Sequence, residues 1–251
     1  MQKIIAYLRL MRPANIVTAI ADIMLGFAVA GLVHSPLIMD GSHVASLGWL
    51  ALSTMGLYGG GVVFNDVFDA KLDKIERPER PIPSGKASKT GATILGTLLF
   101  LEGILAASMV SSLSTIMAFG ICILALLYNR FSKHHQFIGP VNMGACRGAN
   151  LLLGVSAVPA SVSLYWYIAL IPIVYIAAMT MISQGEVHGG KKHTFNIAFF
   201  LYMLVIASVI SLSMLKEEYL LHTIPFLLLF SYLIFPPLYK AMKLLQPSLI
   251  G

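Results

Sequence analysis

Long apolar stretches alternate with short polar segments along the whole chain. A hydrocarbon layer of about 30 Å needs about 20 apolar residues of helix, at a rise of about 1.5 Å per residue. Stretches of suitable length lie at 14–33, 47–65, 91–110, 113–129, 138–158, 164–182, 195–215 and 219–239. Because backbone polar groups in lipid must be satisfied within their own segment, this pattern predicts an all-α bundle of about eight transmembrane helices.

The composition agrees with a membrane protein. Of the 251 residues, 57% are hydrophobic and 11% are charged, and the mean hydropathy is +0.82. A soluble domain carries roughly 25% charged residues, so a soluble globular protein is excluded. A chain this apolar would also collapse, which excludes a disordered protein. The two cysteines lie within apolar stretches and indicate no disulfide framework.

The basic residues favour one orientation in the membrane. If the spans alternate from the first residue, one side receives 15 of the 17 lysines and arginines. They are Lys3, Arg9, Arg12, Lys71, Lys74, Arg77, Arg80, Lys86, Lys89, Arg130, Lys133, Lys191, Lys192, Lys240 and Lys243. The positive-inside rule then predicts that both termini are cytoplasmic in the cell (inner) membrane. The net charge of +6 follows from this topology and does not indicate nucleic-acid binding. A basic face suits membrane lipid headgroups or a phosphorylated substrate.

Two long polar loops indicate a weak internal duplication. The loop 66–90 follows the second predicted span, and the loop 183–194 follows the sixth. Both are cytoplasmic in the predicted topology. We therefore expect residues 1–251 to form a single domain with two pseudo-repeated halves, about 1–135 and 136–251, and one site built from both halves around a central cavity.

The first of these loops carries an acidic motif. Asn65, Asp69 and Asp73 are spaced at i, i+4 and i+8, so we expect them to stack on one helical face, with Asp66 beside them. Stacked carboxylates repel one another, so helix stability does not favour the arrangement. Bound Mg²⁺ would favour it, because that ion takes carboxylate oxygens together with water and substrate phosphates. A solvated helix end is the alternative interpretation.

Basic residues follow the acids within the same loop. Arg77, Arg80 and Lys86 can bind diphosphate oxygens, and three interspersed prolines stiffen the segment that presents them. The loop therefore combines oxygen ligands for a divalent cation with cations for a phosphorylated ligand.

The sequence NDVFDAKLDKIERPERPIPSG at 65–85 resembles the first aspartate-rich motif of the UbiA superfamily of membrane prenyltransferases. The pair Arg12 and Pro13, and the stretch RGANLLLG at 147–154, are also similar to that family. The resemblance implies a helical bundle whose cavity is capped by two aspartate-rich cytoplasmic loops. There Mg²⁺ holds an isoprenyl diphosphate, which ionises and alkylates an acceptor. Asn65, Asp69 and Asp73 would be metal ligands, with Asp66 nearby.

The second loop departs from the family pattern, which usually has two aspartates spaced i, i+4. At 183–192 the chain reads SQGEVHGGKK, so Glu186 takes the place of the first aspartate and Gly190 that of the second. Glu186 keeps a carboxylate for metal binding and catalysis, whereas His188 is a poor Mg²⁺ ligand. Lys191 and Lys192 are expected to offset diphosphate charge. This variant resembles the EboC-type branch of UbiA-like proteins.

A further family motif, YxxxK, is shifted by one residue. Tyr128 is followed by Ser132 at the family spacing and by Lys133 one position later. One residue rotates a helical side chain by about 100°, so Lys133 can take the lysine's part in diphosphate binding only if the helix relaxes there. The family bundle also usually has nine helices, whereas this pattern predicts eight.

Three charged residues lie at apparent membrane depth, where an unpaired charge costs a few kcal/mol or more. We expect Asp22 to pair with Arg147, either at the cavity or as a purely structural pair, and we have no partner to suggest for Glu102. The candidate cavity residues are Asp22, Arg147, Asn150, Tyr128 and His188.

The resemblance thus implies a Mg²⁺-dependent prenyltransferase that moves an isoprenyl group from its diphosphate to a small aromatic or lipid-like acceptor. A degenerate relative that binds a prenyl diphosphate or prenyl lipid without transfer, and so assists export of a metabolite, is the first alternative, because Gly190 supplies no ligand. A secondary transporter would explain the spans and the duplication. It does not explain the acidic motif and the proline-rich basic loop.

Overall fold

The computed structural model describes residues 2–32, 41–187, 192–214 and 217–244. Within these ranges the chain is almost wholly helical and contains no strand. Seven helical segments are long and apolar enough to cross a membrane: Lys3–Val29, Gly41–Asp69, Lys89–Ser108, Ser112–Ser132, Pro159–Ser183, Thr194–Met214 and Leu220–Lys240. The fifth predicted span, 138–158, also forms a helix, but Asn142, Arg147 and Asn150 make it less apolar than the other seven. The prediction of an all-α membrane bundle is confirmed.

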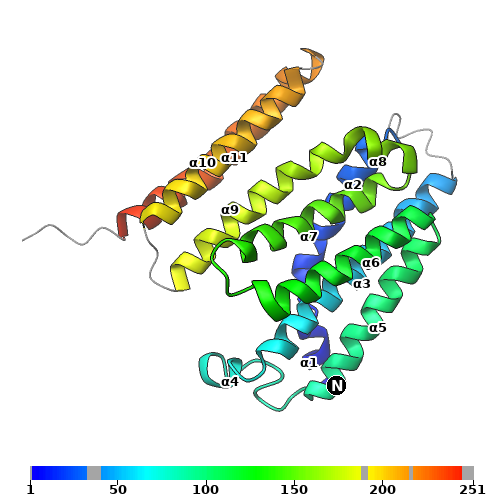
Figure 1. The fold of residues 1–251 in the computed structure, drawn as a ribbon, viewed down its shortest axis with the longest axis vertical. Helices are drawn as coiled ribbons and strands as arrows, with labels where there is room; N and C mark the ends of the chain where they lie inside the picture. Colours follow the sequence, from blue (N-terminus) through cyan, green and yellow to red (C-terminus); the bar gives the residue numbers. More distant parts are fainter. Residues whose placement is uncertain (1, 33–40, 188–191, 215–216, 245–251) are drawn as a thin grey trace, which may run out of the picture. The chain divides into compact units, whose positions relative to one another are not determined.

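Each predicted span has a counterpart in the structure (Figure 1). The long helices are α2 (Pro13–Val29), α3 (Gly41–Asp69), α5 (Lys89–Ser108), α6 (Ser112–Leu127), α7 (Ile138–Val155), α9 (Leu170–Val187), α10 (Lys192–Met214) and α11 (Glu217–Leu244). Shorter elements lie between them: α1 (Gln2–Leu10), α4 (Asp73–Glu76), the π-turn η1 (Tyr128–Ser132), α8 (Pro159–Tyr165) and the 3₁₀ turn η2 (Trp166–Ala169).

Local sequence explains where several helices begin. Ser88 and Ser111 cap α5 and α6, because each hydroxyl accepts a hydrogen bond from the backbone N–H three residues later. Pro13 and Pro159 occupy the first turn of α2 and α8. Backbone N–H groups in the first turn have no acceptor within the helix, so a proline there costs no helical hydrogen bond.

The helices form two compact units. The first comprises Met1–Lys133 and Ala145–Ala169, and the second comprises His134–Gly144 and Leu170–Gly251. The predicted duplication into halves 1–135 and 136–251 stays a prediction.

In the first unit α3 lies along α5 and also contacts α2 and α6 (Figure 1). Glycines bring α3 and α5 together. A Cβ atom at Gly56 would lie 2.9 Å from the backbone nitrogen of Gly103, and one at Gly60 would lie 3.0 Å from the carbonyl oxygen of Gly96. Small residues allow such close backbone approach, which helix packing in membranes uses in place of hydrophobic burial. The close packing of α3 on α5 therefore depends on Gly60, and on Gly56 one turn earlier.

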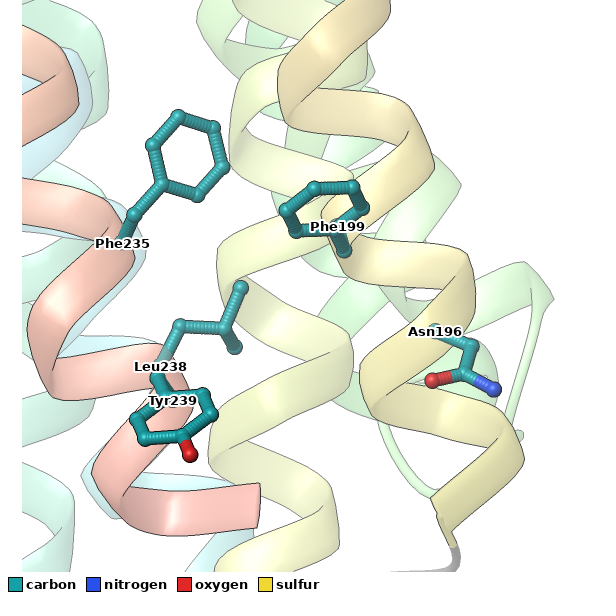
Figure 2. Close-up of a pocket in the computed structure, with 5 residues that line it drawn as sticks. All are labelled: Asn196, Phe199, Phe235, Leu238 and Tyr239. Carbon is teal, nitrogen blue, oxygen red and sulfur yellow. The ribbon is translucent and has the colours of Figure 1, made fainter. Parts of the chain in front are cut away.

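In the second unit α10 packs on α9 and on α11. Tyr175, Tyr202 and Phe230 join the three helices through ring contacts with centroids 5.7–6.4 Å apart. A groove of 330 Å³ lies between α10 and α11, lined by Asn196, Phe199, Phe235, Leu238 and Tyr239. Figure 2 shows the rings of Phe199 and Phe235 lying near each other, with Asn196 three residues before Phe199 on α10. Among the described residues, no acidic or basic side chain lines this groove.

We expect Gly56→Ala to lower the free energy of unfolding by about 1–3 kcal/mol, because its new methyl group meets backbone atoms that cannot move aside. Gly48→Ala on the same helix is the matched control, since a Cβ there meets nothing within 4 Å. It should be neutral, or slightly stabilising through helix propensity. Thermal unfolding in detergent measures both. Equal losses of stability would show that the contact between α3 and α5 is not tight at Gly56.

Candidate active site

The acidic motif lies where α3 ends, but it does not continue as one helix. The helix ends at Asp69, a turn covers 70–72, and α4 begins at Asp73. The expected stack of Asn65, Asp69 and Asp73 on one helical face is therefore wrong. The break has a physical benefit, because a continuous helix would hold the carboxylates against one another, whereas the turn lets each of them meet a cation.

Asp66 and Asp73 converge on Arg80. Its Nη1 lies 2.8 Å from Oδ2 of Asp73 and 3.3 Å from Oδ1 of Asp66. Arg12 adds a second cation to Asp66, with Nη2 2.7 Å from the same oxygen. Both aspartates are buried, with 5% and 3% of their surface exposed. Burying a carboxylate costs several kcal/mol unless a cation and hydrogen bonds accompany it. Two guanidinium groups meet this requirement here.

Arg12 reaches Asp66 from a strained backbone. It precedes Pro13 at the start of α2, with φ 47° and ψ 63°. Among the described residues it is the only non-glycine residue with positive φ. Such a conformation costs of the order of 1–3 kcal/mol and persists only where its surroundings impose it. The bend between α1 and α2 and the ion pair with Asp66 are the surroundings that hold it.

Asn65 and Asp69 face a different partner, the π-turn η1. The Asn65 side-chain Nδ2 donates to Oδ1 of Asn129 at 2.9 Å. The ammonium group of Lys133 forms an ion pair with Oδ2 of Asp69. Two residues four apart on α3 thus contact two residues that are four apart around the π-turn. The acidic motif is divided into two sets, one with Arg12 and Arg80 and the other with Asn129 and Lys133.

The π-turn resolves the shifted YxxxK spacing. The backbone N–H of Lys133 donates to the carbonyl of Tyr128 at 3.0 Å, five residues earlier. This i→i+5 bond accommodates one extra residue in the turn, and single π-turns of this kind are frequent at functional sites. The relaxation that the sequence required for Lys133 is therefore present, and Lys133 contacts an acid of the motif.

The predicted pair at membrane depth is also present. Nε of Arg147 lies 2.5 Å from Oδ2 of Asp22, and its Nη2 donates to the carbonyl of Thr18 at 2.7 Å. Asn150 donates to the same Asp22 oxygen at 3.3 Å and accepts from the hydroxyl of Thr54 at 2.6 Å. These contacts join α2, α3 and α7 within the first unit.

The remaining predicted residues are placed as follows. Arg77 and Lys86 are exposed, and neither forms an ion pair within the described residues. Tyr128 is half-buried at the start of η1. Glu102 contacts no cation in the described part of the chain, and its carboxylate lies beside Gly56. His188 and Lys191 lie outside the described residues, as do the side chains of Glu186 and Lys192.

The sequence model of the UbiA prenyltransferase family matches residues 19–242. The chain belongs to this family. Digeranylgeranylglyceryl phosphate synthase of Methanothrix thermoacetophila is 31% identical over 159 residues, which cover 63% of this chain and 57% of that protein. The chain spans about half the length of the curated relatives it matches. Assignment to the EboC-type branch of UbiA-like proteins stays a prediction.

Solved structures share the fold. A structure described as digeranylgeranylglyceryl phosphate synthase in membranes matches 98% of this chain and 94% of its own, with a TM-score of 0.73 and 24% identity. A UbiA homologue from Archaeoglobus fulgidus, bound to GPP and Mg²⁺, matches 96% of each chain, with a TM-score of 0.72 and 14% identity. The chain is thus an integral membrane protein of the UbiA fold.

The motif of this UbiA-family chain has the chemistry for Mg²⁺ but not a preassembled cage. Among the described residues no three His, Cys, Asp or Glu side chains lie close enough to hold a metal ion together. Mg²⁺ is usually held by one or two carboxylates, with water and substrate phosphates completing its octahedron. The oxygen ligands at the end of α3 fit this pattern. Each acid of the motif is paired with a cation of the chain itself.

The sequence alone did not identify two residues of this UbiA-family site. The sequence marks Arg12 as one of the basic residues and as half of an Arg-Pro pair, and the signal for its contact with the motif is its position before a proline at the start of a span. Asn129 was missed because nothing in the sequence marks it apart from its position after Tyr128. Its importance depends on the π-turn.

We expect Arg80→Met to lower the free energy of unfolding by about 3 kcal/mol, since removal of one partner from a buried ion pair leaves a desolvated charge. Asp73 then has no cation within the described residues, and Asp66 keeps only Arg12. Lys74→Met is the control, because Lys74 is exposed on α4 and in no described ion pair. Chemical or thermal unfolding in micelles checks the difference. An equal effect of both substitutions would show that the pairs with Arg80 do not stabilise the fold.

Proposed function

We propose that this chain is a Mg²⁺-dependent intramembrane prenyltransferase. The observation that carries the proposal is the pairing of Asp66, Asp69 and Asp73 with Arg12, Arg80 and Lys133 at one helix end. A site that holds acids and bases in contact can exchange those internal partners for a divalent cation and a diphosphate. Membership of the UbiA prenyltransferase family and the GPP and Mg²⁺ of the Archaeoglobus fulgidus homologue support it.

The residues divide into two roles. Asn65, Asp69 and Asp73 would hold Mg²⁺, with Asp66 beside them and Glu186 from the second loop. The diphosphate would contact Arg77, Arg80, Lys86, Lys133, Lys191 and Lys192. When bound, Mg²⁺ supplies positive charge that stabilises a leaving diphosphate. The described cations of this set lie in the same unit as the acids.

The chain's own residues prepare the ionisation. Lys133 leaves Asp69 for a phosphate oxygen, and Arg80 does the same from Asp73, so charge-assisted hydrogen bonds form on the diphosphate as it departs. The C–O bond of the allylic diphosphate breaks and its electron pair leaves with the diphosphate. The carbocation then forms a bond to the acceptor, which loses a proton. The apolar surroundings keep water from the cation.

We favour a lipid-like acceptor over a small aromatic one. The relatives named digeranylgeranylglyceryl phosphate synthase support this choice, since their name gives a prenylated glyceryl phosphate as the product. The polar network of Asp22, Arg147 and Asn150 would offer hydrogen-bonding groups at membrane depth to a hydroxyl or headgroup. Arg147 is partly accessible, with 19% of its side chain exposed.

We further propose that the acidic loops and both termini are cytoplasmic, in the cell membrane. The distribution of 15 of the 17 basic residues supports this orientation. Prenyl diphosphates are charged and water-soluble at one end. A site at the cytoplasmic surface can therefore bind the diphosphate group while the helical bundle binds the apolar prenyl group.

A second function is favoured by one feature of the sequence. Gly190 stands where the family has an aspartate, so the second loop offers fewer metal ligands. A protein with this change can retain diphosphate binding and lose transfer. It would then carry a prenyl diphosphate or prenyl lipid and assist export of a metabolite.

The deciding assay offers labelled allylic diphosphates of several chain lengths and a membrane lipid extract to the purified protein. We expect Mg²⁺-dependent diphosphate release with the label in a new lipid. Asp69→Asn and Asp73→Asn should each lower release roughly 100-fold, since each removes charge on which transition-state stabilisation depends. Glu76→Gln, an exposed acid on α4, is the matched control and should keep full activity. Tight binding without release supports the second function, whereas neither binding nor release contradicts both.

We also expect Mg²⁺ and diphosphate to bind cooperatively, because each frees the internal partner of the other. With Mn²⁺ as a spectroscopic substitute, inorganic pyrophosphate should tighten metal binding, and Lys133→Met should reduce this coupling by about fivefold or more. The same variant should bind Mn²⁺ more tightly than wild type when pyrophosphate is absent, since Asp69 then has no cation within the described residues. Lys74→Met is the control. Independent binding of metal and pyrophosphate in the wild-type protein would refute the exchange of partners.

A further inference from the structure

Asn129 is a buried amide that connects the π-turn to α3. Its side-chain Nδ2 donates to the carbonyl oxygen of Gly61 at 2.9 Å, and its Oδ1 accepts from Nδ2 of Asn65 at 2.9 Å. Only 7% of its surface is exposed. Asn129 therefore contacts α3 at two points one turn apart, the second of them at the first residue of the acidic motif.

These two bonds fix the orientation of both amides. A backbone carbonyl can only accept, so Gly61 requires the NH₂ group of Asn129 to face it. The oxygen of Asn129 must then face Asn65, which can satisfy it only with its own NH₂ group. The oxygen of Asn65 consequently points away from Asn129, and it accepts no hydrogen bond from any residue that the structure describes.

The orientation matters because an amide binds a hard metal ion only through its oxygen. If the Asn65 amide were reversed, its N–H groups would face the metal and repel it. We propose that Asn129 is a positioning residue of the metal site, which holds Asn65 so that its oxygen is available as a ligand. This inference rests on the proposed function in one respect, namely that Asn65 is a ligand.

The π-turn makes this arrangement possible together with the contact of Lys133. Asn129 lies opposite Asn65, and Lys133 lies opposite Asp69 on the same face of α3. Asn129 thus positions the Asn65 amide through a neutral hydrogen bond, while Lys133 neutralises the neighbouring Asp69 through an ion pair. Hydrogen-bond partners of metal ligands typically affect metal affinity by about 10- to 100-fold.

The test measures Mn²⁺ affinity by electron paramagnetic resonance on the purified full chain, with inorganic pyrophosphate present. Asn129→Leu removes the acceptor that orients Asn65 and should weaken Mn²⁺ binding by about tenfold. Asn129→Asp keeps that acceptor and should bind Mn²⁺ at least as tightly as wild type. Both substitutions lose the donor to Gly61, so thermal stability should fall in both and does not distinguish them.

Asn65→Asp supplies the second arm. A carboxylate presents an oxygen in either orientation and needs no positioning. In the Asn65→Asp background, Asn129→Leu should therefore leave Mn²⁺ affinity unchanged. The double-mutant cycle should then give a coupling between positions 65 and 129 equal to the whole tenfold loss that Asn129→Leu causes in the wild-type protein. A purely structural role for Asn129 would produce the same loss of affinity in both backgrounds.

Two results would overturn the inference. One is equal weakening of Mn²⁺ binding by Asn129→Leu and Asn129→Asp, and the other is an unchanged loss from Asn129→Leu in the Asn65→Asp background. If Asn129→Leu does not fold, the affinity of Asn129→Asp alone decides, because a tenfold loss there contradicts the inference. If Asp69→Asn and Asn65→Ala both bind Mn²⁺ as wild type does, the proposed metal site itself is refuted, which is a separate outcome.

Discussion

The ion pairs at the end of α3 are the constraint on which the rest of the site depends. Asp66 and Asp73 are buried beside the membrane, where a carboxylate without a cation costs several kcal/mol. The cations come from three separate parts of the first unit: the junction before α2, the loop after α4, and the residue after the π-turn. The ion pairs that neutralise the acids therefore also hold these three segments against α3. The same contacts fix the charge balance of the site and the conformation of its loops.

The helix packing behind the motif gives these contacts a fixed frame. Gly56 and Gly60 let α3 approach α5 closely, and the segment between the two helices carries the turn at 70–72, α4 and Arg80. Close backbone contact leaves little freedom to slide, since interiors are packed at the density of organic crystals. The acids at the end of α3 are thus placed by a helix pair whose close contact is sterically fixed. Arg77 and Lys86 lie in the exposed part of the loop, where no ion pair within the described residues fixes them.

The sequence predicted the spans well because each is a long apolar run, and length and hydropathy determine where a helix can cross a membrane. It also predicted the pair of Asp22 and Arg147, because two opposite charges at membrane depth have few other partners. The predicted continuous helix was wrong at the break after Asp69. The helical spacing does not continue through 70–72, because the backbone there follows the ion pair of Asp73 with Arg80, seven residues later in the sequence. The role of Asn129 was inaccessible for a similar reason. It arises from a π-turn, which a single sequence does not announce, and from a hydrogen bond across 64 residues.

The balance of charge in the site bears on how the proposed reaction can turn over. In the structure the three acids of the motif pair with three cations, and none of these six charges lacks a partner among the described residues. With a divalent cation on the acids and a diphosphate on the bases, every charge again has a partner. A metal ion or a diphosphate by itself would leave some of these groups unpaired, which is the costly condition for buried ions. The proposed ligands should therefore arrive and depart as a pair, with the internal ion pairs forming again as the diphosphate leaves.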